Sequence, residues 1–128
     1  MGLIPEEVVK AWEDREDAVV FVTSDPDGTP NAVYVTCVGM YRKEHIVIAD
    51  NYFDKTKKNI QARKKGTILF ITKEKKSYQL KGSLEYETSG EHYDFMKTWN
   101  PTKLPGHAAA ILTPERIFSG ARKIIEFG

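Results

Sequence analysis

The stretch that decides the fold is Ile48 to Ile60, which reads IADNYFDKTKKNI. It begins inside an apolar, β-branched segment, His45 to Asp50, that has the character of a strand. Residues 51–54 break the strand, and residues 55–65 are too polar and basic for a strand but fit a helix that Gly66 can end. The inward-facing residues of this helix are expected to be Ile60 and Ala62. A strand therefore leads through a short turn into a basic helix.

The start of this helix is a candidate anion site. The first N–H groups of a helix lack partners within the helix, and the positive end of its dipole lies there. Lys55 adds a charge and Thr56 adds a hydroxyl donor, so a phosphate monoester is the ligand that fits best. The alternative is that Asp54 or Thr56 only caps the helix and that the lysines form a solvated surface.

Apolar segments on both sides of this stretch predict the other elements. In residues 30–41 both alternate faces are mostly apolar, so both are expected to be covered. The full set is a helix at 5–13, strands at 18–24, 30–41, 45–50, 67–72, 77–88 and 108–113, helices at 55–65 and 91–99, and a last strand or hairpin with Ile117, Phe118, Ile124, Ile125 and Phe127. Six or seven short strands joined mainly by hairpins indicate an antiparallel barrel or sandwich with short flanking helices.

The composition limits the function classes. A chain of 128 residues, 41% hydrophobic and 29% charged, is expected to form one globular domain, residues 1–128. No apolar run approaches the roughly 20 residues of a membrane-spanning helix, and the N-terminus does not resemble a signal peptide. Cys37 is the single cysteine, which fits a cytoplasmic protein. We therefore expect no membrane partner.

The charge is unevenly distributed. The net charge is +1, but residues 55–65 hold six basic residues and no acidic one, leaving 13 basic against 18 acidic residues elsewhere. A nucleic-acid role, using this helix with Tyr52 and Phe53, is less favoured than a small-molecule phosphate site because the overall charge is so low.

Other kinds of site are weakly supported. His45, His92 and His107 are isolated in the sequence without metal-ligand spacing, so no metal is expected. Cys37 fits a small buried residue in a strand. No serine lies in a nucleophile-elbow motif and no glycine-rich phosphate loop is present. The sequence identifies no catalytic residue.

The order of elements resembles the FMN-binding split barrels of the pyridoxamine 5'-phosphate oxidase-like superfamily. The resemblance covers about Val8 to Ser119 and rests on the turn at 27–30, the strand at 31–36, the strand at 45–50 followed by Phe53-Asp54-Lys55-Thr56 and Asn59, the segment 78–83, and Trp99. The Lys-Thr pair is its most specific feature. The chain is shorter than true pyridoxamine-phosphate oxidases and lacks their arginine-rich substrate signatures, so that activity is not expected.

The resemblance implies a mainly β, six- to seven-stranded antiparallel split β-barrel and a set of FMN contacts. Lys55 and Thr56 would hold the phosphate, and Trp99, with the loop at 103–106, would reach toward the cofactor of a partner subunit. The complete implied set of cofactor-binding residues is Tyr34, Val35, Thr36, Ile48, Ala49, Asp50, Phe53, Lys55, Thr56, Gln79 and Trp99.

The implied function is that of a homodimeric FMN-binding flavoprotein, an oxidoreductase that passes hydride or electrons from a nicotinamide or other small-molecule donor to a small acceptor. Two alternatives stay open. One is an FMN-binding electron carrier without a dedicated substrate, and the other is a deazaflavin-dependent reductase. No nucleic-acid partner is expected.

Overall fold

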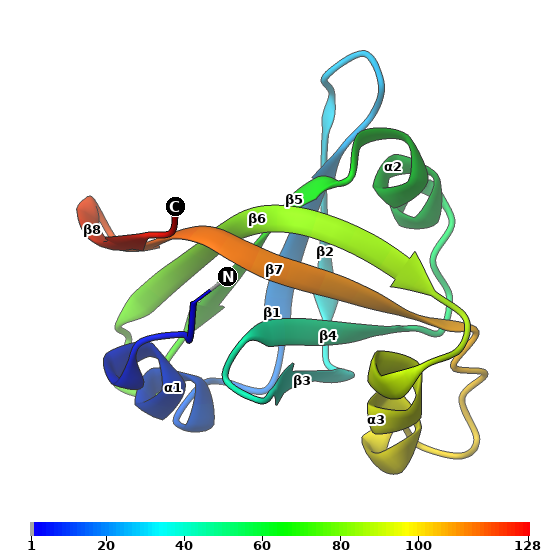
Figure 1. Cartoon of the computed structure of the whole chain (residues 1–128), viewed down its shortest axis with the longest axis horizontal. Coiled ribbons are helices and arrows are strands. Elements are labelled where there is room, and N and C mark those ends of the chain that lie inside the picture. Colours follow the sequence, from blue (N-terminus) through cyan, green and yellow to red (C-terminus); the bar gives the residue numbers. More distant parts are fainter. Residues whose placement is uncertain (1) are drawn as a thin grey trace.

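The computed structural model describes residues 2–128 as one curled antiparallel β-sheet with three short helices (Figure 1). The mainly β fold class is confirmed. The helices are α1 (Glu6–Glu13), α2 (Lys55–Arg63) and α3 (Glu91–Trp99). The strands are β1 (Val19–Ser24), β2 (Pro30–Val35), β3 (Val38–Tyr41), β4 (His45–Asp50), β5 (Lys65–Ile71), β6 (Ser77–Glu87), β7 (Ala108–Ser119) and β8 (Arg122–Glu126).

The sheet order is β2-β1-β5-β6-β7-β4-β3, with β8 paired to β7 outside this path. The long strands β6 and β7 form the curved back of the sheet (Figure 1). Their register shifts between Lys81 and Gly82, and a Cβ on Gly82 would lie 1.9 Å from the carbonyl oxygen of Thr113. Only glycine allows this close approach, which lets the two strands bend together.

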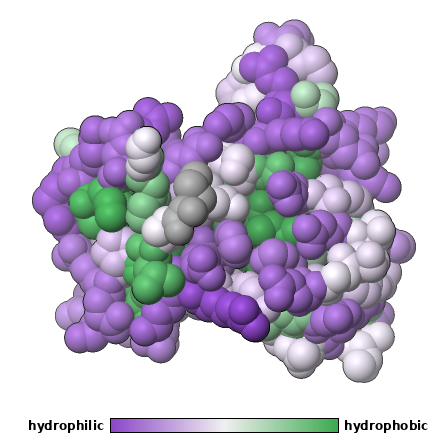
Figure 2. Space-filling view, in the orientation of Figure 1, coloured by the Kyte–Doolittle hydropathy of each residue, from purple (hydrophilic) through white to green (hydrophobic). Residues whose placement is uncertain are grey.

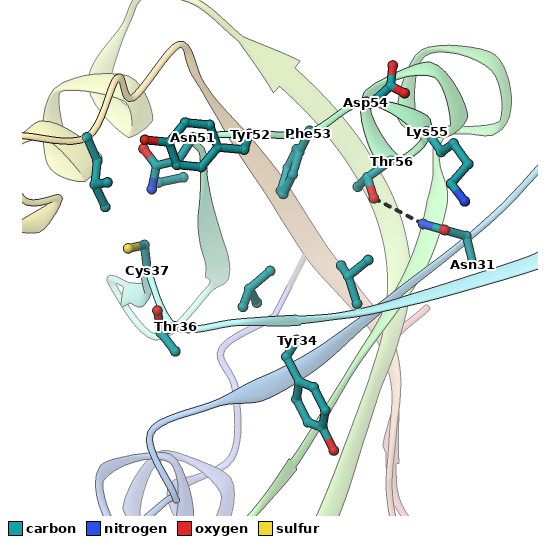
Figure 3. A pocket seen from close by; sticks show the side chains of 14 residues that line it. Asn31, Tyr34, Thr36, Cys37, Asn51, Tyr52, Phe53, Asp54, Lys55 and Thr56 are labelled. Carbon is teal, nitrogen blue, oxygen red and sulfur yellow. Dashed lines mark hydrogen bonds between the residues drawn. The ribbon is translucent and has the colours of Figure 1, made fainter.

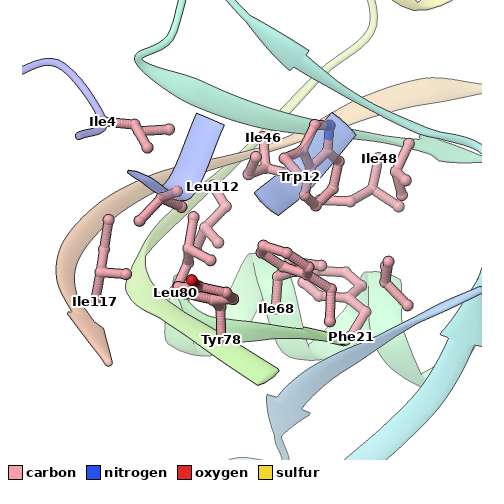
Figure 4. Packing of buried hydrophobic residues seen from close by; sticks show 14 of the residues in the cluster. Ile4, Trp12, Phe21, Ile46, Ile48, Ile68, Tyr78, Leu80, Leu112 and Ile117 are labelled. Atoms are coloured by element: carbon pink, nitrogen blue, oxygen red, sulfur yellow. The ribbon is translucent and has the colours of Figure 1, made fainter. Parts of the chain in front are cut away.

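The concave side of the curled sheet encloses the main hydrophobic core, which α1 closes at one end (Figures 1 and 4). Its largest fully buried side chains include Phe21, Phe70, Tyr78 and Leu80. A smaller cluster lies between α3 and the sheet, around Val47, Ala49, Met96, Ala109 and Ile111. Strand β4 is therefore apolar on both sides, because its alternate residues enter different clusters.

The segment 30–41 is two strands, not the single strand that its alternation predicts. β2 pairs with β1, while β3 pairs with β4, and only Thr36 and Cys37 separate them. Since β2 and β3 are the two ends of the sheet order, these two residues carry the chain across the gap between the edges. The expectation that both faces are covered is also wrong for β2, where Ala32 and Tyr34 are exposed in this chain.

The sequence also underestimates the number of strands. Residues 108–113 and 117–118 belong to the single strand β7, and β8 follows as the other arm of a hairpin. Pro114 stays within β7, opposite Gly82, next to the register shift. With β2 and β3 separate, residues 2–128 form eight strands where six or seven were expected.

Helix α2 ends earlier than predicted. Lys64 takes the left-handed position (φ 56°) that ends the helix, and Gly66 lies within β5. Ile60 is buried as expected, but Ala62 is exposed. The other inward residues are polar: Thr56 and Asn59 are buried, and the Asn59 amide donates to the Thr23 hydroxyl at 3.1 Å. The helix therefore docks on the sheet through hydrogen bonds as well as through Ile60.

No helix within residues 2–128 has the length and apolar character needed to cross a bilayer. The face of the molecule seen in Figure 1 is mainly hydrophilic, with apolar side chains in separate patches (Figure 2).

Glu7 of α1 joins three elements. One of its carboxylate oxygens accepts hydrogen bonds from Arg122 of β8 at 2.6 Å, from the Tyr78 hydroxyl at 3.1 Å and from Lys76 at 3.4 Å. The hydrogen bond from Arg122 is the main cause that lowers the pKa of Glu7. Because the folded-state pKa is lowered, this carboxylate stabilises the fold above the ordinary glutamate pKa, and the stabilisation is lost as the pH falls through the lowered value.

We predict that Glu7→Gln lowers the free energy of unfolding by about 1 kcal/mol near neutral pH, since the site is partly exposed and solvent screens its ion pairs. The deficit should shrink on acidification below pH 4.5, where the native carboxylate also loses its charge. Urea unfolding from pH 3 to 7 measures this. Glu6→Gln is the control, because the Glu6–Lys43 pair is longer (3.6 Å) and more than half exposed. A pH-independent difference would contradict the assignment.

Candidate functional site

A pocket of about 450 Å³ opens at the gap between the two edges of the sheet (Figure 3). Strand β2 and the connection to β3 form one wall, and the segment from the end of β4 to the start of α2 forms the other. The lining residues are Asn31, Val33, Tyr34, Val35, Thr36, Cys37, Ala49, Asn51, Tyr52, Phe53, Asp54, Lys55, Thr56 and Leu104.

One end of the pocket is the start of α2. No side chain caps this helix: Asp54, at the N-cap, pairs instead with Lys58 at 3.8 Å. The Thr56 hydroxyl accepts a hydrogen bond from the Asn31 amide at 3.0 Å, which leaves its hydrogen available to a ligand. Lys55 is exposed and has no carboxylate within 4 Å in the part of the chain described. The capping part of the alternative is therefore wrong, whereas Lys55, Lys57 and Lys58 are exposed, as its second part expects. Within residues 2–128 no side chain accepts a hydrogen bond as a cap of α2, so its first N–H groups could serve an anion.

The middle of the pocket is apolar. Val33 and Val35 of β2 line it together with Phe53, which lies in the turn before α2. The Phe53 ring packs on the core, with its centroid 6.0 Å from that of Phe21. Cys37, Asn51 and Tyr52 lie at the end opposite Lys55 (Figure 3), and Ala49 and Leu104 complete the lining. The pocket therefore combines an end formed by the start of α2, with Lys55 and Thr56, and an apolar slot.

Asp50 fixes the turn that places the helix start. Its side chain is buried and accepts hydrogen bonds from the Phe53 N–H at 2.9 Å and from the Tyr86 hydroxyl of β6. Burial, together with the bond to Asp50, raises the pKa of Tyr86 above its usual range. The backbone carbonyl of Asp50 also accepts the His107 N–H at 2.8 Å. The carboxylate thus acts within the protein and does not line the pocket.

Seven of the predicted cofactor contacts line this pocket: Tyr34, Val35, Thr36, Ala49, Phe53, Lys55 and Thr56. The Tyr34 side chain points away from it, so this residue contributes its backbone (Figure 3). Contacts between these residues and a cofactor stay a prediction.

The other four predicted contacts do not line the pocket of this chain. Ile48 is fully buried in the main core, and Asp50 holds the turn. Gln79 lies on the opposite, outer side of β6, between Leu69 and Phe118 of the neighbouring strands. Trp99 packs beside the smaller cluster under α3. Its indole N–H is buried and has no hydrogen-bond partner within the described residues.

Seven residues that line the pocket lie outside the predicted set of cofactor contacts: Asn31, Val33, Cys37, Asn51, Tyr52, Asp54 and Leu104. Asn31 is a polar residue among apolar neighbours in a strand, which is a local signal that could have identified it. Asn51 has no such signal, because its role depends on contacts between segments about 50 residues apart. Leu104 belongs to the loop at 103–106, which the resemblance directs toward a partner's cofactor, whereas in this structure Leu104 lines the pocket of its own chain.

The histidines are not all isolated in space. The Nε2 atom of His92 lies 3.2 Å from Nδ1 of His45, and Nδ1 of His92 lies 3.4 Å from a carboxylate oxygen of Glu87. Burial and the neighbouring His92 lower the pKa of His45. Neither ring lines the pocket. Within residues 2–128, no group of three or more His, Cys, Asp and Glu side chains is arranged to hold a metal ion.

Comparisons with known proteins show which protein family this chain resembles in sequence. The family model described as pyridoxamine 5'-phosphate oxidase matches residues 4–120. An uncharacterized protein of Methanocaldococcus jannaschii is 34% identical over 92 residues, which are 70% of this chain and 60% of that protein. The chain therefore covers about 60% of the length of this curated relative.

Solved structures share the fold. HupZ from Group A Streptococcus has a TM-score of 0.81 at 23% identity, covering 98% of this chain and 100% of its own. An FMN-binding protein from Syntrophomonas wolfei has a TM-score of 0.72 at 17% identity, covering 93% and 84%. An F420 reductase has a TM-score of 0.69 at 16% identity, covering 90% and 98%. At these identities the likeness is one of fold alone.

We predict that Asp50→Ala lowers the free energy of unfolding by about 3 kcal/mol, because the Phe53 N–H and the Tyr86 hydroxyl lose their acceptor in a largely buried place. Tyr86→Phe, which removes one of these donors, should cost about 1 kcal/mol. Denaturant unfolding measures both.

The control is Asp54→Ala, at the exposed N-cap four residues along, where a change within about 0.5 kcal/mol is expected. Equal effects at Asp50 and Asp54 would show that Asp50 does not organise the turn.

Proposed function

This chain belongs to the pyridoxamine 5'-phosphate oxidase family, and we propose that it binds FMN and acts as a flavin-dependent oxidoreductase. The observation that carries the proposal is the continuity of the pocket, in which an uncapped helix start with Lys55 and Thr56 opens directly into an apolar slot. A phosphate joined to a planar ring system is the kind of ligand that needs both parts.

The residues at the helix start fit a phosphate monoester. The free N–H groups of α2 are directional donors, the Lys55 ammonium supplies charge, and the Thr56 hydroxyl can donate because Asn31 occupies its acceptor side. Within residues 2–128 no carboxylate forms an ion pair with Lys55, so none would compete with a bound anion for its ammonium group. These groups support FMN over riboflavin, which lacks the phosphate.

The rest of the pocket fits a ring. Its volume of about 450 Å³ lies in the range of small-molecule sites, and Val33, Val35 and Phe53 form apolar walls. Near Thr36 and Cys37 the ladder between β2 and β1 has ended, so strand-end amides and the Thr36 hydroxyl are available for the polar edge of a ring. Bound FMN would supply the redox chemistry, while these residues bind it, orient it and exclude water.

We propose that no histidine of this chain transfers a proton in the reaction, because none lines the pocket within residues 2–128; the titratable side chains that do line it include Cys37, Tyr52, Asp54 and Lys55. The proposed electron donor is a nicotinamide or other small molecule, and the proposed location is the cytoplasm. An FMN-binding electron carrier would use the same site. Deazaflavin is the second candidate cofactor, supported by the fold shared with an F420 reductase.

We predict that the purified protein carries FMN or takes it up, with riboflavin bound more weakly. Lys55→Ala should weaken FMN binding by about one to two decades, since a charge-assisted hydrogen bond contributes about 1.5–3 kcal/mol. Calorimetric titration with FMN and riboflavin measures this, and the absorption spectrum of the bound cofactor distinguishes flavin from deazaflavin.

Lys58→Ala is the matched control, because Lys58 lies on the same helix but already pairs with Asp54. It should bind FMN like the unmodified protein. Equal affinities for FMN and riboflavin would contradict the phosphate site, and retention of a deazaflavin alone would replace FMN as the cofactor.

We also propose that the protein is a homodimer. Direct cross-strand pairing puts one row of side chains on the outer face of the sheet: Tyr34, Val20, Leu69, Gln79 and Phe118. Four of these are apolar or aromatic, and Tyr34 is 79% exposed. A continuous row of this kind favours burial against a second copy, and two-fold dimers are the commonest soluble assembly. In such a dimer Gln79 and Tyr34 would face the partner.

We predict that Tyr34→Asp shifts the protein to a monomer, because a buried, unpaired carboxylate in this row is costly. Sedimentation at micromolar concentrations measures the change. Leu3→Asp is the control, since Leu3 is also exposed (63%) but lies outside the row. A monomeric parent protein, or an unchanged dimer in Tyr34→Asp, would contradict this interface.

A further inference from the structure

We propose that the Asn51 and Asn100 side chains form an amide clasp that holds Leu104 as the end wall of the pocket and so controls access to its apolar end. Leu104 is thereby assigned as a specificity-determining residue, and the two asparagines as positioning residues. The inference rests on the proposed function only where it says which ring the pocket accepts. The clasp itself, and its effect on the loop, do not depend on that function.

The clasp consists of three hydrogen bonds on buried groups. The Asn51 amide nitrogen donates to the Asn100 side-chain oxygen at 3.0 Å, and the Asn100 amide nitrogen donates back to the Asn51 oxygen at 2.9 Å. The same Asn51 oxygen accepts the Gly106 N–H at 2.9 Å. Asn51 is 8% exposed and Asn100 is 7% exposed. Buried amides that are satisfied reciprocally lock one arrangement, because any other leaves them unpaired.

The clasp ties both ends of a loop to one point. Asn100 begins the segment, Gly106 ends it, and the next residue, His107, donates its N–H to the Asp50 carbonyl at 2.8 Å. Residues 101–105 between these anchors belong to no helix or strand. The loop therefore depends on the 50–51 segment for its position.

The backbone conformation and the missing side chain of Gly106 allow this contact. Its φ of 51° lies in the left-handed region, and a Cβ here would come within 2.9 Å of the Asn100 amide nitrogen and 2.8 Å of the Lys97 ammonium. The Lys97 ammonium also donates to the Pro105 carbonyl at 3.2 Å. A side chain at position 106 would push the loop away from the clasp.

Leu104 is the loop residue that enters the pocket lining. Asn51, to which the loop is tied, lies with Cys37 at the end of the pocket opposite Lys55 and Asn31 (Figure 3). Leu104 thus closes the apolar end. Its position limits how far a planar ring can extend past Phe53 and how much water reaches that end.

Cys37 gives a readout that needs no cofactor, since it is the single cysteine and lines the same pocket. The rate of its alkylation by iodoacetamide should rise roughly tenfold in Asn100→Ala, because loss of a buried partner costs about 1–3 kcal/mol of local stability. Exchange of the Gly106 amide should accelerate similarly. Thr102→Ala, at an exposed position of the same loop, is the matched control and should match the parent in both measurements.

Leu104→Ala is the second variant, in case Asn100→Ala unfolds. It leaves the clasp intact and should raise the Cys37 rate while Gly106 exchange stays slow. If Leu104→Ala leaves the rate of Cys37 alkylation unchanged, Leu104 is not the end wall. If a folded Asn100→Ala leaves the exchange rate of the Gly106 amide unchanged, the clasp does not hold the loop. Exchange at Ile48 and Leu112, which are fully buried, reports whether each variant is folded.

Ligand binding separates this inference from the proposed function. If the parent protein binds FMN, Leu104→Ala should weaken FMN and riboflavin by the same factor, because the phosphate end is untouched, whereas Lys55→Ala should weaken FMN alone. A Leu104→Ala variant that loses only FMN affinity overturns the end wall. A parent that binds neither flavin contradicts the proposed function, while the alkylation and exchange results still decide the clasp.

Discussion

The structure depends on one crossing of the chain between the two edges of its sheet. Strands β2 and β3 are nearly continuous in sequence, yet they lie at opposite ends of the strand order, and Thr36 and Cys37 alone span the gap. The Ala49 N–H donates to the Cys37 carbonyl at 3.0 Å, which holds the crossing against β4. Because two residues cannot fill the space that a missing strand pair leaves, the gap remains open as a pocket. The site is thus a direct consequence of how the sheet fails to close.

The same gap explains why the helix start matters. Helix α2 is a weak helix by composition, with four lysines or arginines among its nine residues and no acidic residue in its first turn to favour its dipole. It is held on the sheet by Ile60, which is buried in the main core, and by two hydrogen bonds: Asn31 donates to Thr56, and Asn59 donates to Thr23. In a helix stabilised mainly by capping, side chains of the protein would accept hydrogen bonds from the first N–H groups. Leaving them free costs stability but keeps them available to an anion, as expected where a local rule is broken at a functional site.

Local features of the site could be predicted from the sequence, and its long-range features could not. The change at residues 48–60 from β-branched to basic identifies the helix start and Lys55 and Thr56 without any knowledge of the fold. The division of β2 from β3 was not recognised, because apolar residues occupy both alternate faces of the segment, Val33 and Val35 on one and Val38 and Met40 on the other. Alternation also does not report which strand pairs with which. Gln79, which the resemblance includes among the cofactor contacts, lies on the outer face of β6, and only strand pairing reveals this. Likewise, neither Asn51 nor Asn100 stands out in the sequence, and only the fold brings their side chains together.

The two ends of the pocket are held by different parts of the structure. This difference determines which substitutions can change one end without changing the other. The anion end is built on a helix and two strands, so its geometry follows from elements that also hold the core. The apolar end is closed by a loop whose position depends on two side chains and one backbone N–H. Substitution in residues 101–105 can therefore alter the end wall without disturbing the helix start, because the clasp lies outside that segment. A site of this design can keep one phosphate-bearing cofactor while it changes what reaches the ring, which is how one fold can serve several reactions.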